Sequence, residues 1–425
     1  MKTLLLLLVF ASPAFADSWT LDGYLEQVRA SSYDLKKAEE GAGLAGREYV
    51  SSLAAFWLPE ITLRAANAPY SVYNSPRLTL EKDNTSAAVT ASLNLFNNFK
   101  DKTALERSKI SRDLADRFAW QERQRVTLAA LGTYYNVLRK RRLLDVVKTS
   151  LGSYEEQFRK TQRYYKDGMK SYSDVLKSEL NLRSSQLQEV TSFESYRNAL
   201  MDFNLSLYRS PRLEAELEDV PSAASVPGPS LDADLEMALE NRVEIVAAAL
   251  ELRQAELDQR KGALDALPNL SADLYYNRQG IGSWGRPAAG TVNPVYSATL
   301  SLSLPLGPET FSDRKNYLAA KVGLDRQKRA LAALKLEVER ELVSRALSLE
   351  TALRTYEVSK MKADISRQSL EIITSRYGVG QAGIIELAEA QRDDLGSQSD
   401  LANALYDLLL ERAAYDRAAG RQLWK

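Results

Sequence analysis

The chain has 425 residues and carries 56 basic and 56 acidic side chains, so its charge gives no sign of a nucleic-acid partner. It contains no cysteine and no histidine, which excludes disulfides, thiolate and imidazole chemistry, and the usual ligands of zinc and haem. Most enzyme classes need one of these groups, so we expect no enzyme, no cofactor and no metal site. An enzyme that works with carboxylates alone, such as a glycosidase, is the alternative that the composition leaves open.

The first residues have the order of a secretory signal. Lys2 precedes an apolar run over 4–10, and Ala14-Phe15-Ala16 has the small-x-small pattern of a cleavage site. We predict a signal peptide over 1–16 and a mature chain from Asp17, not lipidated because no cysteine follows; a buried first helix is the alternative. No later run approaches the roughly 20 apolar residues that a spanning helix needs. If the exported chain enters a membrane, it must do so as strands.

The mature chain begins with a predicted helix and two predicted strands. Apolar residues recur at helical spacing over 22–56, and Leu58-Pro59 ends the helix. Residues 61–66 and 89–95 alternate apolar and polar side chains, which is the period of a strand. The segment 67–86 between them contains two prolines and is predicted to be a loop. The expected strands are therefore short, about 7 to 10 residues, near the length of a tilted membrane strand.

A long helix follows, because 100–165 contains no proline and only two glycines, Gly132 and Gly152. At about 1.5 Å per residue it would be roughly 99 Å long. A turn at Asp167-Gly168, a helix over 173–208 and a proline-rich linker over 211–230 come next. The end of the long helix has a seam that steps by three and four, as in helices that pack on other helices: Leu144, Val147, Leu151, Tyr154, Phe158, Thr161 and Tyr165.

The same order of elements then returns. The second set consists of a helix over 231–264, strands near 270–276 and 298–306 around a glycine-rich loop over 280–294, a helix over 311–377, and a last helix over 384–419. Leu231 follows Leu21 by 210 residues, Pro268 follows Pro59 by 209, and Tyr377 follows Tyr165 by 212. A fixed internal period indicates a tandem repeat. We predict a first repeat over 17–210, a linker over 211–230 and a second repeat over 231–425.

Element lengths predict how the parts fit together. The helix over 173–208 could stack end to end on the helix over 231–264, and the first helix of the chain on the last. Each strand has one apolar and one polar face, as in outer-membrane strands, although a soluble two-sheet sandwich shows the same alternation. Four strands cannot close a barrel alone, because even about eight make only a narrow one. Several copies would therefore have to share the barrel.

With this repeat the sequence resembles the TolC family of bacterial outer membrane efflux proteins. The resemblance also rests on Leu-Pro before the first strand of each half, on Leu304-Pro305-Leu306 after the last strand, and on the segments 165–176 and 377–387. It implies a mostly α fold with membrane β, in which long coiled-coil hairpins join a trimeric barrel of 12 strands, four from each copy. The helices would form a tunnel across the periplasm.

The resemblance also implies function and partners. The protein would be a passive exit duct of a tripartite efflux or type I secretion system, gated at its periplasmic tip. Its partners would be two further copies of itself, a periplasmic adaptor, an inner-membrane pump or ABC transporter, and outer-membrane lipid. A periplasmic coiled-coil adaptor or scaffold is the alternative. It would explain the helices but not the matched strands, and the glycine-rich lipoyl-like modules of adaptors are absent.

Acidic residues near the second tip turn are the candidate gate. Glu386 and Glu389 occupy positions where the family often has aspartate, and their spacing of three places them on one helix face. In a trimer they would form a ring that attracts cations, as charged rings do in cation channels; solvated charges on an outer face are the alternative. Asp393 and Asp394 are weaker candidates. Some family members stabilise the closed tip with arginine contacts between neighbouring coils, whereas Gln381 and Ala382 offer none here, although Arg376 and Arg392 lie nearby.

The two tip turns are the candidate adaptor contacts. Gly168 with Ser171 forms the first turn, and Gly380 with Gly383 forms the second. The resemblance implies that they engage the adaptor, whereas ordinary helix-ending glycines would account for the same residue types without a partner. Asp174 is expected to cap the returning helix, where an acidic residue suits the positive helix end.

Overall fold

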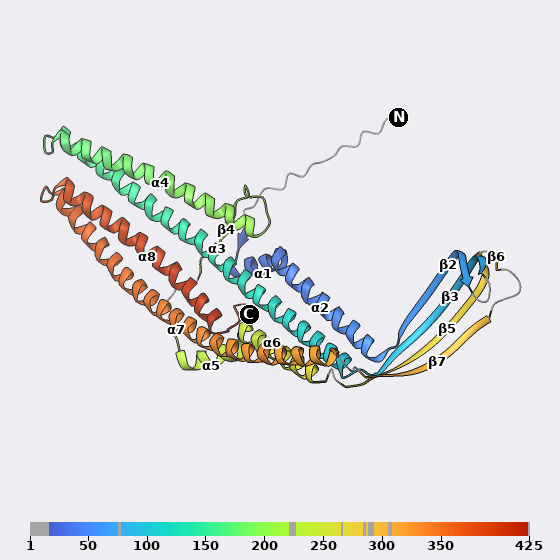
Figure 1. The fold of residues 1–425 in the computed structure, drawn as a ribbon. Helices are drawn as coiled ribbons and strands as arrows, with labels where there is room; N and C mark the ends of the chain where they lie inside the picture. Colours follow the sequence, from blue (N-terminus) through green and yellow to red (C-terminus); the bar gives the residue numbers. More distant parts are fainter. Residues whose placement is uncertain are drawn as a thin grey trace, which may run out of the picture. The chain divides into compact units, whose positions relative to one another are not determined.

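The computed structural model describes residues 17–74, 78–220, 227–264, 267–283, 286–287, 293–304 and 308–423, so the predicted signal peptide lies outside the described residues. The chain divides into two units (Figure 1). We call Met1–Lys37, Trp120–Arg242 and Leu336–Lys425 the helical unit, and Ala38–Ala119 and Val243–Lys335 the sheet unit. None of the described helices combines the length and the apolar character needed to cross a membrane.

The sheet unit contains the four predicted strands in one antiparallel sheet. They are β2 (Glu60–Asn74), β3 (Leu78–Phe96), β5 (Asn269–Ser283) and β7 (Asn293–Ser303), in the spatial order β2-β3-β5-β7, and the short β6 (Arg286–Pro287) pairs with the end of β5. With 15, 19, 15 and 11 residues, they are longer than the predicted 7 to 10.

The predicted loops were wrong where the structure describes them. Asn67 pairs with Thr85 and Tyr73 with Thr79, so most of the expected loop over 67–86 is strand. Likewise β5 continues to Ser283 and β7 starts at Asn293, within the expected loop over 280–294. The prolines misled the prediction because β2 lies at the edge of the sheet, where the missing N–H of Pro69 is tolerated.

Strand register gives the sheet one apolar and one polar face, as the alternation predicted. One row across the sheet holds Ile61, Ala91, Leu274 and Ala298, and the next holds Leu63, Val89, Tyr276 and Tyr296. Polar residues fill the opposite face, as in the row of Ser92, Asp273 and Thr299. The rings of Tyr276 and Tyr296 lie 5.0 Å apart, yet Leu63 and Tyr296 are each 74% exposed. The apolar face is therefore uncovered in a single chain.

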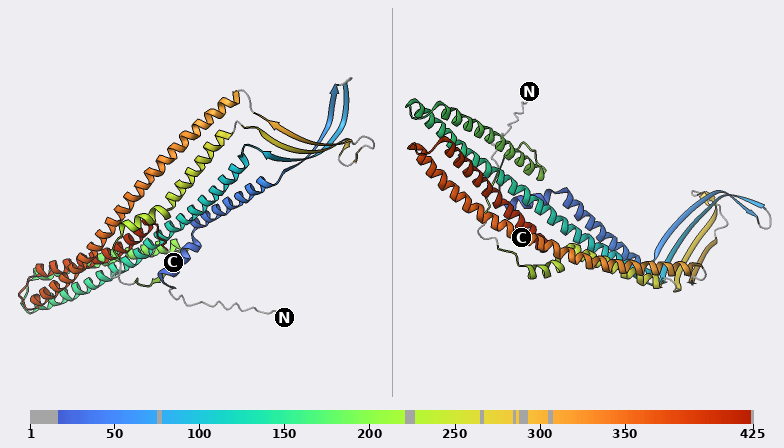
Figure 2. Two further views of the ribbon diagram at one scale, coloured as in Figure 1. Left: turned by 90° about the horizontal axis from the view of Figure 1, so that it is seen from below. Right: turned by 60° about the vertical axis from the view of Figure 1, so that its left-hand side comes forward.

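The helices of the sheet unit follow the order of the strands. They belong to α2 (Tyr33–Trp57), α3 (Lys100–Lys166), α6 (Val243–Leu264) and α7 (Pro308–Gly378), which run side by side in that order in the left view of Figure 2. Arg112 of α3 stacks 4.8 Å from the ring centroid of Tyr49 in α2, and Arg107 lies 2.9 Å from Asp258 of α6. At Gly262 of α6 a Cβ would lie 3.0 Å from Tyr317 Cα, so glycine permits the close approach of α7.

Two long antiparallel hairpins make up most of the helical unit. The first joins α3 to α4 (Tyr172–Ser206), and the second joins α7 to α8 (Ile384–Ala418). The long helices are confirmed, with 67 residues in α3 and 71 in α7. The predicted seam of α3 is buried or half-buried at every position except the exposed Tyr165. The three-and-four spacing therefore identified the packed face of the helix.

Two predicted helices are each broken at one residue. Residues 22–56 form α1 (Leu21–Ser31) and α2, separated by Ser32, and 231–264 form α5 (Leu231–Asn241) and α6, separated by Arg242. Both separating residues have extended backbones. The Ser32 hydroxyl accepts a hydrogen bond from Leu35 N–H, a local bond that competes with the helix.

The predicted linker contains a strand that the sequence did not reveal. Within it, β4 (Ala215–Leu217) pairs in parallel with β1 (Asp17–Trp19). The Tyr134 hydroxyl donates to the carbonyls of Trp19, at 2.9 Å, and Glu218, at 2.8 Å. The pair of strands borders the main core of the helical unit, where Tyr24 stacks on Phe203 at 4.5 Å between ring centroids.

Each repeat closes on itself at its ends, so the predicted stacking partners were wrong. The first helix meets α4, because the Tyr24 hydroxyl lies 2.7 Å from Ser206 Oγ. In the same way α5 meets the end of α8, because a Cβ on Gly420 would lie 3.3 Å from Asn241 Cβ. Similar helix lengths do not determine which helices pack together. The observed contacts show that the first and last helix of each repeat meet.

Three buried tyrosines predict a late alkaline transition. Burial raises the pKa of Tyr24, Tyr134 and Tyr415 to about 12. Because the folded state holds these protons more tightly, their contribution to stability is complete below about pH 10 and is lost as the pH rises toward about 12. Tyrosinate absorbance should therefore show a late group that titrates together with loss of helical circular dichroism. Tyr24→Phe, which keeps the ring stack, should remove one tyrosine from that group; uniform titration near pH 10 with the helices intact would contradict this.

Candidate functional site: the two hairpin tips

The first tip, residues 167–171, depends on a glycine in the left-handed conformation. Gly168 has φ +74°, which a side chain would strain. Gly168 N–H donates to Tyr165 O at 3.0 Å, and Met169 N–H donates to Tyr164 O at 2.8 Å, so the last carbonyls of α3 are satisfied by the turn. The helix therefore ends where the sequence predicted.

Ser171 and Asp174 fix the start of α4. Ser171 Oγ accepts a hydrogen bond from Asp174 N–H at 3.2 Å, and Asp174 Oδ2 accepts one from Ser171 N–H at 3.1 Å. This reciprocal capping box satisfies two N–H groups that a helix start would leave unpaired. The predicted capping role of Asp174 is confirmed.

The second tip, residues 379–383, uses its glycines differently. Gly380 has φ +79° and carries the turn, and its N–H donates to Tyr377 O at 3.1 Å. Gly383 is the N-cap of α8 with φ −86°, where other residues fit equally well and where no side chain caps the helix. Gly378 is the last residue of α7.

Polar contacts between the two hairpins join their tips. The hydroxyls of Thr161 and Tyr377 lie 3.0 Å apart and are buried, and the Tyr164 hydroxyl donates to Gly378 O at 3.3 Å. The Lys170 ammonium lies 4.5 Å from the ring centroid of Tyr377. Burial also raises the pKa of Tyr377. These contacts must break if the hairpin ends separate.

The sequence marked Thr161 only as a seam position of α3, and Tyr377 only as the counterpart of Tyr165 in the second repeat. The available signal was a hydroxyl side chain near the end of each long helix, at a position where a packed helix usually carries an apolar residue. Tyr377 also belongs to a small apolar cluster at the second tip with Ala382, Ile384 and Leu387. Position 382, which has no arginine, therefore holds a buried alanine. The contact of Thr161 with Tyr377 joins the tips instead.

The predicted acidic residues lie on the exposed side of α8. Glu386 is in its first turn, and Arg376 NH1 lies 3.5 Å from Glu386 Oε1. Glu389 is exposed one turn further on and has no ion pair within the part of the chain that the structure describes. Asp394 accepts a bond from Gln398 at 3.4 Å, and Arg392 Nε donates to Ala388 O. The ring would need the acids of three copies, so it stays a prediction.

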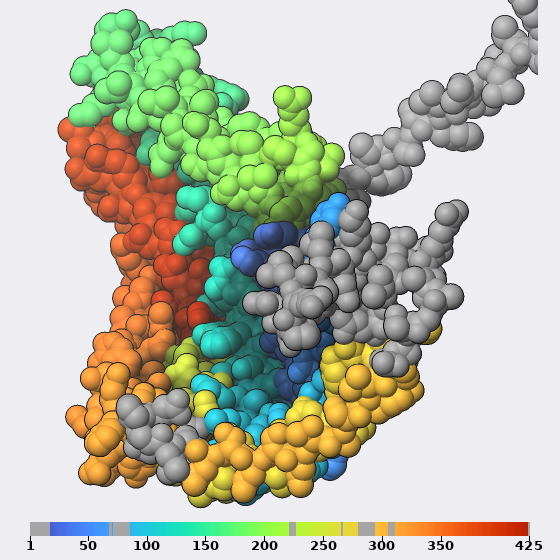
Figure 3. Space-filling view, turned by 45° about the vertical axis from the view of Figure 1, so that its right-hand side comes forward, coloured from blue at the N-terminus to red at the C-terminus, as the bar shows by residue number. Residues whose placement is uncertain are grey.

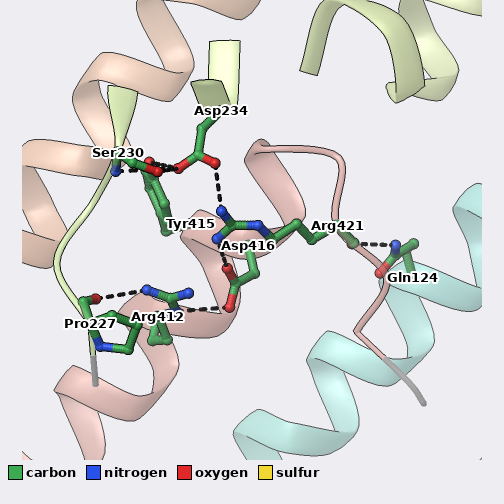
Figure 4. A network of polar contacts seen from close by, with 8 residues as sticks. All are labelled: Gln124, Pro227, Ser230, Asp234, Arg412, Tyr415, Asp416 and Arg421. Carbon is green, nitrogen blue, oxygen red and sulfur yellow. Dashed lines mark hydrogen bonds and ion pairs between the residues drawn. The ribbon is translucent and has the colours of Figure 1, made fainter. Parts of the chain in front are cut away.

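A second polar network closes the other end of α8 (Figure 4). Asp234, which is 1% exposed, accepts hydrogen bonds from Ser230 Oγ at 3.0 Å and from the Tyr415 hydroxyl, and it lies 2.5 Å from Arg421 NH2. Arg421 NH1 also lies 2.7 Å from Asp416 Oδ1. The network links the start of α5 to the end of α8.

The protonation of this network follows from its contacts. Burial alone would raise the pKa of Asp234, but hydrogen bonds from Tyr415 and Ser230 and the charge of Arg421 outweigh it, so the pKa lies below its ordinary value. The Arg421 carbonyl accepts a bond from Gln124 Nε2 of α3 at 2.8 Å. The segment after α8 is thereby tied to three helices.

Curated relatives match nearly the whole chain. The outer membrane protein TolC of Vibrio cholerae is 24% identical over 390 residues, covering 88% of this chain and 85% of that protein. The alkaline protease secretion protein AprF of Pseudomonas aeruginosa is 24% identical over 313 residues, covering 70% of this chain and 61% of AprF.

Solved structures share the fold. CusC superposes with a TM-score of 0.82 at 13% identity, covering 95% of this chain and 92% of that one. The outer-membrane channel OprN superposes with a TM-score of 0.79 at 17% identity, covering 95% and 90%. The family profile described as outer membrane efflux protein matches residues 24–206 and 235–421, one segment in each repeat. The chain belongs to the outer membrane efflux protein family.

Proposed function

We propose that three copies of this chain form a passive exit duct from the periplasm through the outer membrane, serving a tripartite efflux or type I secretion system. The signal peptide over 1–16 would direct export without lipidation, and the repeats over 17–210 and 231–425 would be joined by the linker over 211–230. The observation that carries the proposal is the uncovered apolar face of the four-stranded sheet. Exposed to water, this apolar face would promote aggregation, whereas a membrane strand needs an apolar face toward the lipid.

The edges of the sheet favour association of copies. Among the described strands, β2 and β7 are the two edges, and each leaves one row of backbone groups unpaired. Unpaired edges invite pairing with another chain. Pairing β7 of one copy with β2 of the next would join four strands from each of three copies into one closed sheet, with the polar face toward the lumen.

The helices offer matching surfaces. Both α4 and α7 carry exposed apolar residues at coiled-coil spacing, and Figure 3 shows the outer side of α4, in green, open to solvent where it is in view. A helix of this kind is stable when its stripe packs on a partner helix. The stripe residues are Leu176, Leu180, Leu187, Val190 and Leu205 of α4, and Leu336, Leu347, Val358, Met361, Ile365 and Ile372 of α7.

The tips supply the gate and the contact with other proteins. Glu386 and Glu389 of three copies would form the cation-attracting ring at the aperture, and the contacts of Tyr377 with Thr161 would hold the tip in its present state. Gly168, Ser171, Gly380 and Gly383 shape the turns that a periplasmic adaptor would meet. The inner-membrane partner would be a pump or an ABC transporter, and the name of AprF, a secretion protein, supports the secretion role.

Assembly and conductance test the proposal. The protein extracted in detergent should have the mass of a trimer, show helix and strand signals in one species, and conduct ions in planar bilayers. Because the chain has no cysteine, Ile61→Cys in β2 combined in turn with Cys at Tyr296, Ala298 or Leu300 in β7 should give disulfides between copies. Within a chain these strands are about 14 Å apart, beyond disulfide reach. A monomer that stays soluble without detergent would overturn the proposal.

A further inference from the structure

A charged side chain, Arg278 of β5, lies on the apolar face of the sheet. In the rows that run from Leu302 to Pro294, every other described residue of this face is aliphatic, aromatic or proline. Arg278 pairs with Ala87 of β3 and with Pro294 of β7, so neither cross-strand neighbour offers a carboxylate. Among the residues that the structure describes, the exposed Arg278 has no ion-pair partner. Its charge is therefore not neutralised within the chain.

Arg278 lies at the border of the apolar band. Along β5 this face is apolar from Leu270 to Tyr276. The distance from Leu270 to Arg278 is about 27 Å along an extended strand, or about 20 Å across a membrane at the usual tilt, close to the apolar band of about 25 Å in outer-membrane barrels. Because α6 ends at Leu264 and β5 begins at Asn269, Arg278 is on the end of the sheet away from the helices. In a membrane this is the level of the lipid headgroups, where arginine is best tolerated.

An open hollow of about 370 Å³ lies on the same face, over β3, β5 and β7. Its volume is within the range of small-molecule sites, about 300 to 1,000 Å³. Ala91 and Ala298 leave room there because their side chains are small. The rings of Tyr276 and Tyr296, 5.0 Å apart, border the hollow on the side toward Arg278. An apolar hollow of this kind suits a hydrocarbon chain, because a polar ligand would lose hydrogen bonds to water on entering it.

We propose that Arg278 and this hollow form a binding site for a membrane lipid whose headgroup carries a phosphate. The guanidinium binds the phosphate with two of its N–H groups, the tyrosine rings lie at the headgroup level, and an acyl chain fills the hollow. The site rests on the proposed exit-duct function, which places the apolar face against lipid. Each copy holds one such lipid in the leaflet farther from the helices, so a trimer holds three.

The position and chemistry of the site favour a lipid over other occupants. Pairing of β7 with β2 of the next copy uses the edges of the sheet, so it leaves the hollow over β3, β5 and β7 uncovered. Free phosphate would match Arg278 but leave the hollow empty, and a lipid without phosphate would fill the hollow but leave the guanidinium unpaired. An amphipathic anion matches both.

Two lipids with identical oleoyl chains test the proposal, a phosphatidic acid and a diacylglycerol that lacks the phosphate. In native mass spectrometry the detergent-solubilised full-length trimer should retain up to three molecules of the phosphatidic acid and bind it at least about tenfold more tightly than the diacylglycerol. Arg278→Gln should lower the affinity for the phosphatidic acid by about tenfold and leave that for the diacylglycerol unchanged. Ala298→Leu, which fills the hollow with an apolar side chain, should lower the affinity for both lipids by about fivefold.

Arg64→Gln is the matched control for the lost charge. Arg64 pairs with Ala88, next to Ala87 in β3, so it lies at a similar level of the sheet but on its polar face. Its replacement should alter the affinity for either lipid by less than about twofold. Inorganic phosphate at about 50 mM should leave most of the lipid bound, because it competes for the guanidinium but not for the hollow.

Trimer mass and bilayer conductance, measured on every variant, report the proposed function independently. Intact channels that bind the two lipids equally, or that lose the phosphatidic acid to inorganic phosphate, would overturn the lipid site alone. Equal losses in the Arg64 and Arg278 variants would also overturn it, because the effect would then follow net charge rather than position. A native protein that forms neither trimers nor channels would overturn the proposed function itself.

Discussion

Replacing Glu386 and Glu389 together by glutamine should weaken block of the channel by multivalent cations by about 100-fold, since three copies would lose six carboxylates at one aperture. The same variant should raise the conductance measured under blocking conditions, because fewer cations reside at the tip. Arg376→Gln should act in the opposite direction, because it removes the guanidinium that lies 3.5 Å from Glu386. Planar bilayers with the cation added on the side of the tips measure both effects.

A control variant tests whether the effect on block depends on the position of the removed charges. Glu339→Gln with Glu357→Gln removes the same charge from exposed positions of α7 remote from the tips, and block should stay within about twofold of the native channel. Native block in the Glu386 and Glu389 variant would show that these carboxylates face away from the aperture. They would then be the solvated outer-face charges that the sequence also allowed.

Replacing Asp234 by alanine should destabilise the protein by about 3 kcal/mol, because the Tyr415 hydroxyl and Arg421 would lose a buried carboxylate. For a chain of this length that loss corresponds to a fall of roughly 3 to 4 °C in the thermal midpoint of the detergent-solubilised protein. Asp234→Asn keeps an oxygen that accepts hydrogen bonds and should cost less. Asp232→Ala, at an exposed position of the same helix turn, should leave the midpoint almost unchanged. Equal midpoints for the two alanine variants would show that the network contributes nothing.

Lowering the pH should reduce the stability that the Asp234 network contributes. The folded-state pKa of Asp234 is lowered, so the carboxylate contributes stability above its unfolded pKa of about 3.9, and that contribution is lost as the pH falls through the folded value. Asp234→Asn has no such proton to bind. Its midpoint should therefore approach that of the native protein as the pH is lowered, instead of running parallel to it.

The sequence predicted the elements with strong periodicity. The seam of α3 and the return of the same order of elements in the second repeat identified long helices whose bounds agree with the structure within a few residues. The offset of 212 residues between Gly168 and Gly380 located both tip turns, because a left-handed turn position strongly favours glycine. Features that depend on residues close together in the sequence, such as helix periodicity and turn glycines, could therefore be predicted from the sequence alone.

Features that depend on contacts between distant segments could not be predicted in this way. Pro69 suggested a loop because proline fits a strand only at the edge of a sheet. That β2 is an edge strand follows from the pairing of the whole sheet and cannot be read from the local sequence. Strand β4 is three residues long and exists through its pairing with β1, about 200 residues away in sequence. At the tips, the sequence identified candidate acids but not the pairing of Thr161 with Tyr377, since nothing in the sequence indicates that these two side chains face each other.

The matched ends of the two repeats use different chemistry at equivalent positions. Tyr24 stacks on Phe203 in the first repeat, whereas Asp234 and Tyr415, which follow them by 210 and 212 residues, meet through a carboxylate and a hydroxyl in the second. Placing an aspartate at position 24 alone would bury a carboxylate against a phenyl ring. Each partner is therefore suited only to its own counterpart, so the ends of the two halves are not interchangeable residue by residue, and a graft of one end onto the other half would have to carry both partners together.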